Sequence, residues 1–299
     1  MRSVPALALA ALLAACESGI PVLPLTVRTS FSLPPDGTTA PAPRSLAITP
    51  DGNLVCLDTA GRVLVLSPTG ALIRGWRMPD SAVGKPEGVR WLADGRLAVC
   101  DTHYHQVVLF DGTTGAVVLT FGREGKGPGE FGFPVAIDTD PEGRLYVCEY
   151  GGNDRIQVFD RAGQYLREFG SFGTGPGQLQ RPGGIAWHDH RVYVADATNH
   201  RIHVFAESGE YQGMLGASEG VGWDFPYDLE VGPEGDVWTV EYGAGRVRRL
   251  ARTGEVLGEF GRTGTGNDDL RTPWALAVDA TTVYVADTGN RRVVAYARR

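Results

Sequence analysis

The sequence predicts an all-β protein, a six-bladed β-propeller that is closed by an N-terminal strand completing the last blade. Three observations predict this fold. One pattern of short strands recurs six times, and a proline and a carboxylate keep a nearly constant spacing within it. One further strand near the N-terminus has no neighbouring strand to pair with. The 299 residues include 41 Gly and 19 Pro, which are too many turn formers for long helices. The hydrophobic share of 42% is that of a globular chain.

The repeated unit begins with a proline that opens a short apolar strand, and its copies start at Pro43, Pro86, Pro134, Pro182, Pro226 and Pro273. Successive starts are 43, 48, 48, 44 and 47 residues apart. A period in the forties with several short strands per unit is typical of propeller blades. Each second strand ends in a carboxylate 14 or 15 residues after the proline: Asp58, Asp101, Glu149, Asp196, Glu241 and Asp287.

The sixth copy reaches Arg299 after only three strands, which leaves a sheet edge exposed and the ring open. Larger residues and smaller polar residues alternate along 25–33 with a period of two, which is typical of a strand with one buried face. No partner hairpin lies beside this segment. We therefore expect this segment to pair as the outer strand of the sixth blade. Residues 25–299 then form one domain.

The N-terminus has the features of an export signal. Arg2 precedes an apolar run at residues 4–15, too short to span a bilayer, and the run ends in Leu13-Ala14-Ala15-Cys16. This end resembles the lipobox of bacterial lipoproteins, which implies cleavage before Cys16 and attachment of a lipid to it; the alternative is a generic secretory signal. We expect a signal peptide at residues 1–15, a tether at residues 16–24, and a lipid-anchored, extracytoplasmic location in a bacterial cell envelope, periplasmic or on the cell surface.

Charge and cysteine content limit the partners and the redox chemistry. The net charge of -7 repels phosphate backbones, so we expect no nucleic-acid partner and contact with a membrane only through the anchor. Cys56, Cys100 and Cys148 lie in apolar strand segments, and an odd number of cysteines cannot pair completely. We expect three buried thiols and no zinc site.

Two stretches carry a family resemblance: VYVAD at 192–196 continuing to Phe205, and VYVAD at 283–287 continuing to Tyr296. They resemble the NHL repeat, and the resemblance extends over nearly all of residues 43–299. It implies a six-bladed propeller of the NHL or TolB-like type but no single activity, because NHL propellers serve as enzymes, as platforms for proteins and as RNA binders.

The strand-end carboxylates suggest metal or acid–base chemistry, but the repeat favours a structural role. A basic or amide residue follows each one, at Arg62, Gln106, Arg155, Arg201, Arg246 and Arg292. A carboxylate and a guanidinium across a tight loop can bond each other and brace that loop. The glycine-rich stretches 125–129 and 173–177 lead into strands and not into helices, so they are interpreted as linkers and not as phosphate cradles.

The six histidines are expected to be exposed loop residues. His103, His105 and His200 follow second strands, whereas His188 and His190 occupy a turn after a first strand, so the two groups belong to opposite faces; the sixth is His203. Neither group offers enough ligands for a strong zinc site. No metal site, no cofactor and no catalytic residue is predicted.

The residue after each repeat proline should face the central channel; these residues are Arg44, Glu87, Val135, Gly183, Tyr227 and Trp274. In the related peptidyl-hydroxyglycine amidating lyases, resemblance implies a zinc-binding His at this position, which this chain lacks. The candidate ligand-binding residues are Arg44, Glu87, Tyr227, Asp228 and Trp274. The alternative is that Arg44 and Glu87 pair with each other while the aromatic residues fill the channel.

A second enzyme family is similar over one strand. Glu87-Gly88-Val89-Arg90-Trp91 resembles the opening strand of the gluconolactonase family, which implies a divalent-metal ligand at Glu87. The other ligand positions hold Val135, Gly183, Tyr227 and Trp274, and Asp228 is one residue out of register. The sequence therefore favours a membrane-anchored binding or scaffold protein for a protein, peptide or glycan. The alternative is a channel-centred hydrolase or lyase, either a metal-dependent lactonase or an amidating-type lyase.

Overall fold

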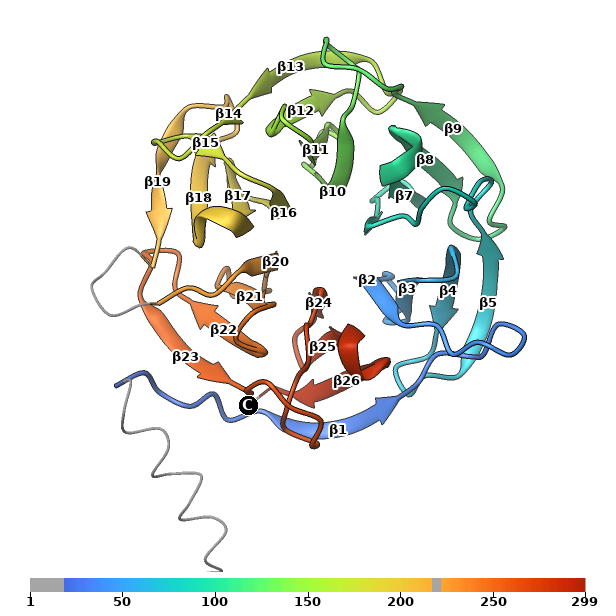
Figure 1. Ribbon diagram of the computed structural model, residues 1–299, viewed down its shortest axis with the longest axis vertical. Helices are drawn as coiled ribbons and strands as arrows, with labels where there is room; N and C mark the ends of the chain where they lie inside the picture. Colours follow the sequence, from blue (N-terminus) through green and yellow to red (C-terminus); the bar gives the residue numbers. More distant parts are fainter. Residues whose placement is uncertain (1–18, 217–221, 299) are drawn as a thin grey trace, which may run out of the picture.

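The computed structural model describes residues 19–216 and 222–298, which form six four-stranded antiparallel sheets arranged in a ring (Figure 1). Each sheet is one blade, and in blades 1 to 5 the chain passes from the innermost to the outermost strand before it enters the next blade. The predicted six-bladed propeller is confirmed.

Blades 1 to 3 follow the chain in order. They consist of β2 (Pro43–Ile48), β3 (Leu54–Asp58), β4 (Arg62–Leu66) and β5 (Leu72–Arg77); of β6 (Gly88–Trp91), β7 (Arg96–Asp101), β8 (Gln106–Asp111) and β9 (Val117–Phe121); and of β10 (Phe133–Thr139), β11 (Leu145–Tyr150), β12 (Arg155–Phe159) and β13 (Tyr165–Phe169). A short parallel pair, β14 (Ser171–Phe172) with β15 (Gln178–Leu179), lies in the loop that leads to blade 4.

Blades 4 to 6 complete the ring. They consist of β16 (Pro182–His188), β17 (Arg191–Asp196), β18 (Arg201–Ala206) and β19 (Tyr211–Leu215); of β20 (Pro226–Val231), β21 (Val237–Glu241), β22 (Arg246–Leu250) and β23 (Val256–Phe260); and of β24 (Ala275–Val278), β25 (Thr282–Asp287), β26 (Arg292–Ala297) and β1 (Thr26–Phe31). Three single-turn 3-10 helices join second to third strands: η1 (Thr102–Tyr104), η2 (Ala197–Asn199) and η3 (Thr288–Asn290).

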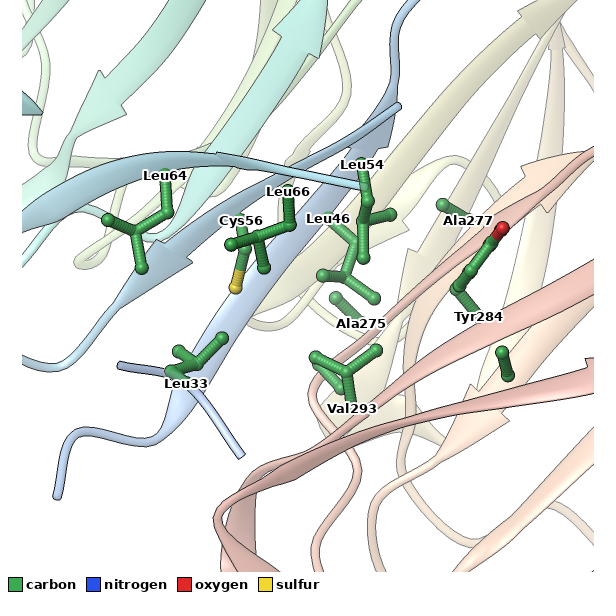
Figure 2. Close-up of a cluster of buried hydrophobic side chains, with 12 residues drawn as sticks. Leu33, Leu46, Leu54, Cys56, Leu64, Leu66, Ala275, Ala277, Tyr284 and Val293 are labelled. Atoms are coloured by element: carbon green, nitrogen blue, oxygen red, sulfur yellow. The ribbon is translucent and has the colours of Figure 1, made fainter. Parts of the chain in front are cut away.

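The N-terminal strand closes the ring as predicted. β1 pairs antiparallel with β26 from Thr26 opposite Ala297 to Phe31 opposite Val293. Leu33 follows the strand and is buried in a cluster formed by blades 1 and 6, where Figure 2 shows it among Cys56, Leu64 and Leu66. The two ends of the domain are thus held together by strand pairing and by a shared core.

The chain just before β1 also packs on the domain. Leu23 donates its N–H to the Glu259 carbonyl and Glu259 donates its own to the Pro21 carbonyl, both at 2.9 Å. Leu23 is buried against blade 5. The last residues of the expected tether therefore lie along β23. Cys16 and the expected signal peptide lie outside the described residues, and no described helix is long and apolar enough to cross a membrane.

The two faces of the ring differ in what they carry. In blade 4, Pro182 lies opposite Asp196 at one end of the first two strands, and His188 lies opposite Arg191 at the other. We define the upper face as the end with the prolines, the strand-end carboxylates and the inter-blade loops. The lower face carries the tight turns that follow first and third strands.

All six strand-end carboxylates are buried and bonded to the residue that opens the third strand, as predicted. The five arginines place Nε 2.7–2.9 Å from a carboxylate oxygen, and in blade 2 the Gln106 amide lies 3.1 Å from Asp101. Burial raises the pKa of Glu149 and of Asp196, and bonds from Arg155 and Arg201 oppose that rise. Each pair forms what we call a brace.

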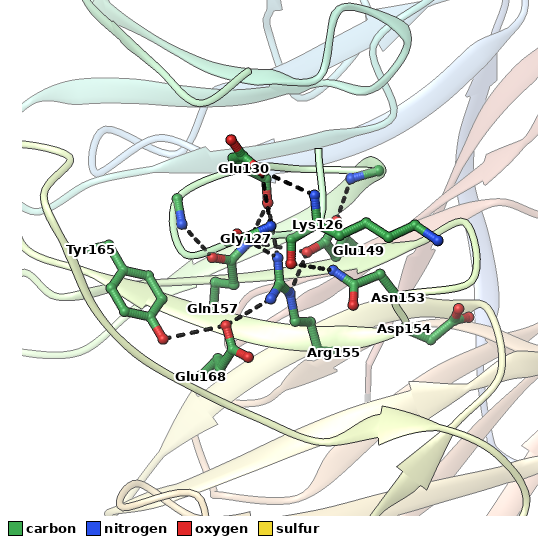
Figure 3. A network of polar contacts seen from close by, with 12 residues as sticks. Lys126, Gly127, Glu130, Glu149, Asn153, Asp154, Arg155, Gln157, Tyr165 and Glu168 are labelled. Atoms are coloured by element: carbon green, nitrogen blue, oxygen red, sulfur yellow. Dashed lines mark hydrogen bonds and ion pairs between the residues drawn. The ribbon is translucent and has the colours of Figure 1, made fainter. Parts of the chain in front are cut away.

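The braces also hold the inter-blade loops. Arg155 Nη2 donates to the carbonyls of Gly127 at 2.9 Å and of Glu130 at 3.0 Å, as Figure 3 shows. The same pair of contacts recurs in two more blades, from Arg201 to Gly175 and Gln178 and from Arg292 to Gly266 and Asp269. In blade 5, Arg246 bonds a single loop carbonyl, that of Gly222. The carbonyls of the glycine-rich loops therefore point at the braces, which confirms that these loops are linkers.

The three cysteines Cys56, Cys100 and Cys148 are buried and unpaired, as expected. Burial raises the pKa of each thiol, so the reactive thiolate is suppressed.

Removal of β1 tests ring closure. A chain that begins at residue 34 loses the β1–β26 pairing and the buried Leu25 and Leu33, so its melting temperature should fall by about 10 °C or more. Thermal unfolding monitored by circular dichroism measures the change, with a chain that begins at residue 19 as control. An unchanged melting curve for the shorter chain contradicts the closure.

A second stability test compares two arginines that contact the same loop. Arg155→Leu leaves the buried Glu149 uncompensated and should lower the free energy of unfolding by about 3–5 kcal/mol. Arg123 is 78% exposed in its ion pair with Glu130, so Arg123→Ala should cost less than about 1 kcal/mol. Chemical denaturation of both variants measures the difference, and equal losses contradict the brace.

Candidate functional site

The five predicted channel residues meet around one cavity at the ring centre. Arg44 Nη2 lies 2.8 Å from Glu87 Oε1, and the side chains are 11% and 7% exposed. The Arg44 guanidinium lies 4.3 Å from the centre of the Trp274 ring, and Tyr227 packs against the same ring at 5.3 Å. The structure thus has the arrangement in which Arg44 and Glu87 pair and the aromatic residues fill the channel.

The paired side chains still present polar atoms to the cavity. Among the described residues, Arg44 Nε and Glu87 Oε2 are buried without a hydrogen-bond partner. The cavity volume is about 30 Å³, which suits one or two water-sized groups. Ligand binding at these residues remains a prediction, and this volume limits it to a small polar group.

A charged cluster crosses the channel below that cavity. Arg90 Nε lies 2.7 Å from Asp138, and Arg90 Nη1 lies 2.7 Å from Glu230 on the blade across the ring. Arg90 and Glu230 line both the central cavity and a separate one of about 210 Å³, so they form the partition between the two. Sequence analysis missed this cluster, although all three residues lie four positions after a repeat proline.

Asp228 adds a carboxyl group beside this cluster. Burial, and then the charge of Glu230, raises its pKa to about 8, although the N–H groups of Leu276 and Leu229 donate to its two oxygens at 3.1 and 2.9 Å. The channel therefore holds a carboxyl group that carries a proton at neutral pH.

The gluconolactonase-type metal site gains no support from the geometry. Glu87 Oε1 is bound by Arg44, and both Asp228 oxygens accept backbone hydrogen bonds. Within residues 19–216 and 222–298, no three His, Cys, Asp or Glu side chains gather as a metal-binding group.

Arg181 and Tyr150 also belong to the upper channel, and the sequence did not indicate them. The Arg181 guanidinium lies 4.9 Å from the centre of the Tyr150 ring. The Arg181 backbone is left-handed, with a φ of 52°. Asp154 fixes it by accepting the Arg181 N–H at 2.5 Å. Phe225 and Thr272, which also precede repeat prolines, share the left-handed conformation, for which the sequence carries no signal.

The histidines divide between the faces as expected, but the expectation that all six are exposed is only partly right: His190 and His200 are exposed, whereas His103, His105 and His188 are half-buried. His105 ends η1 and contacts the Gly132 carbonyl, whereas His190 lies in the lower-face turn 3.0 Å from Glu207. His203 is wrongly predicted as a loop residue: it lies within β18, is buried, and packs on the rings of Phe205 and Tyr211. Burial lowers its pKa to about 4, so it is neutral.

Apolar side chains project from three upper-face loops. Val83 is 75% exposed, Phe172 is 56% exposed and Phe225 is 36% exposed. Their loops are held in place: Tyr104 Oη accepts the Val83 N–H at 3.2 Å, Asn199 donates to the Gly173 carbonyl at 2.9 Å, and His200 Nδ1 accepts the Phe225 N–H at 3.2 Å. The upper face therefore displays apolar groups on a fixed frame.

The comparisons with known proteins agree with this architecture. Residues 179–205 match the NHL repeat model. No curated protein matches the chain.

Solved structures give a broader match. A selenomethionine-substituted virginiamycin B lyase from Staphylococcus aureus has a TM-score of 0.65 and 16% identity, with 92% of this chain and 100% of that chain covered. A streptogramin B lyase has a TM-score of 0.64 and 14% identity, covering 91% and 97%. A Bacteroides caccae protein of unknown function has a TM-score of 0.58 and 18% identity, covering 73% and 81%. Identities this low show a shared fold alone.

The chain is therefore a six-bladed β-propeller that carries an NHL repeat.

The carboxyl group of Asp228 predicts a specific pH dependence. Because its pKa is about 8 in the folded protein and near 3.8 in an unfolded chain, the folded state holds the extra proton between these values. The stability that this proton contributes is present at low pH and is lost as the pH rises through 8. The melting temperature of the unaltered protein should therefore fall more between about pH 5 and pH 9 than that of Asp228→Asn. Parallel curves contradict the assignment, and the exposed Glu210→Gln is the control.

Proposed function

We propose that this protein is a lipid-anchored, extracytoplasmic scaffold that binds a partner protein or peptide on its upper face. The observation that carries the proposal is the set of exposed apolar side chains Val83, Phe172 and Phe225 on loops that hydrogen bonds hold in place. Exposed apolar groups on a rigid frame favour protein association, because little conformational entropy is lost when they are covered.

The braces support the same function. They fix the inter-blade loops from beneath, through guanidinium bonds to loop carbonyls such as those of Gly127 and Gly175. The outward side chains of these loops are therefore free to differ without loss of the fold. This separation of a constant frame from variable contacts is typical of propellers that serve as platforms.

The alternative of a channel-centred hydrolase or lyase gains only the shared fold from the lyase structures. A glycan partner gains no specific contact from the geometry, since the Trp274 ring is covered by Arg44 and packs at a tilt against Tyr227. Binding of a protein or peptide is the function that the described surface supports best.

Site-specific crosslinking tests the binding face. A photoreactive phenylalanine at Phe172 should crosslink to a discrete partner in intact cells, and the same group at Leu166 on the outer strand β13 should not. Phe172→Ser should reduce partner recovery through a crosslinker at Phe225. Equal crosslinking from Phe172 and Leu166, or none from Phe172, contradicts the proposal.

The anchor has its own test. Cys16→Ser removes the thiol that would carry the lipid, so the protein should move from the membrane fraction to the soluble fraction and lose incorporation of labelled palmitate. Cys56→Ser, which alters a buried thiol, is the matched control. A Cys16→Ser protein that still incorporates palmitate contradicts the anchor.

A further inference from the structure

A groove of about 770 Å³ lies on the upper face where the ring closes. Its walls come from the segment that follows β1, from blade 1, from the loop that enters blade 2 and from Arg291, the residue that follows η3. The groove is separate from the central channel, because the two have no lining residue in common.

The groove is cationic in an acidic protein. Arg77, Lys85 and Arg291 line it with a single carboxylate, Asp36, although the whole chain has a net charge of -7. Asp36 is bound to Arg77 at 2.5 Å. The groove therefore has a local charge of about +2, which attracts an anionic partner.

Two of these cations have no carboxylate partner among the described residues. Lys85 Nζ donates to the Ser81 carbonyl at 2.5 Å, and Arg291 Nη1 donates to the Ala40 carbonyl at 3.3 Å. Five other guanidinium groups on the upper face are instead bound to the buried carboxylates of the braces, among them those of Arg155 and Arg201. Lys85 and Arg291 thus retain donors for an incoming carboxylate.

The groove is preformed. Asp36 and Thr39 exchange backbone hydrogen bonds of 3.0 Å, which shapes one wall, and the Met78 N–H donates to the Gly61 carbonyl at 2.9 Å on the other. Arg291 holds a left-handed φ of 54°, fixed by the donation of its N–H to the Thr288 carbonyl at 3.0 Å. His105 after η1 and His200 after η2 have the same left-handed conformation, so the position of Arg291 is set by the repeat.

The rim combines this charge with apolar surface. Val83 does not line the groove itself, but in the sequence it stands between the lining residues Ser81 and Lys85, and it is the most exposed of the large apolar side chains described. A peptide with both acidic and apolar side chains matches these two features, because its carboxylates can enter the groove while an apolar side chain contacts Val83. A polyanionic sugar would use the cations but would leave Val83 uncovered.

We propose that this groove binds an acidic peptide segment of the partner, with carboxylates on Arg77, Lys85 and Arg291 and an apolar side chain on Val83. The proposal rests on the upper-face scaffold function and specifies the chemistry of its partner. The positive charge of the groove attracts the acidic peptide and fixes its position, while Val83 adds an apolar contact.

Fluorescence anisotropy with a labelled, capped octaglutamate peptide tests the groove on the whole protein without its signal peptide. Octaglutamate should bind at least about tenfold more tightly than octaglutamine at about 50 mM salt, and added salt should weaken it. The double variant Arg77→Glu with Arg291→Glu should weaken octaglutamate binding by at least about tenfold.

Arg262→Glu is the matched control, because Arg262 is exposed on another upper-face loop and pairs with Asp269 as Arg77 pairs with Asp36. It should change the affinity less than about twofold, and all variants should melt near the temperature of the unaltered protein. Equal binding of both peptides, equal effects of Arg262→Glu and the double variant, or tighter binding of a heparin hexasaccharide would each overturn the proposal. If the peptide fails while Phe172 still crosslinks to a partner, the groove inference falls and the scaffold function stands.

Discussion

The buried bond between a strand-end carboxylate and the residue that opens the next strand is the interaction on which the rest of the structure depends. It occurs in every blade, and five of the six copies use an arginine. Each arginine has further donors, and in blades 3, 4, 5 and 6 these bind carbonyls of the preceding inter-blade loop. A buried carboxylate would be costly alone, but here it fixes the second strand, the third strand and a loop together.

The functional surfaces follow from this constraint. Because the braces satisfy the loops from beneath, the upper face can carry exposed groups such as Phe172 and unpaired cations such as Arg291 without loss of order. The centre of the ring is occupied differently: Arg44 and Glu87 pair above, and Arg90 ties Asp138 to Glu230 below. These bonds cross between blades, so they tie the first strands of the ring together.

The repeat made much of this predictable. Register alone placed the braces and the residues after each proline, and the missing fourth strand of the last copy pointed to β1. The same register places Arg90, Asp138 and Glu230 at one level, but their pairing depends on which blades face each other and on side-chain reach. Arg181 and Phe225 were missed because their left-handed backbone is imposed by the loop and not by their residue type. His203 was misplaced because it lies within a third strand that is buried on both faces, so its position in the strand, and not its residue type, decides its burial.

Hydrogen exchange of the blade 4 entry loop tests the central role of the braces most directly. Asp196→Asn weakens the bond to Arg201, which holds the carbonyls of Gly175 and Gln178. The amides of Gly173 and Gln178, which bond within this loop, should then exchange at least about tenfold faster, while the Gly209 amide in the lower-face turn of the same blade keeps its rate. Unchanged protection in the loop, or an equal rise at Gly209, would contradict the account.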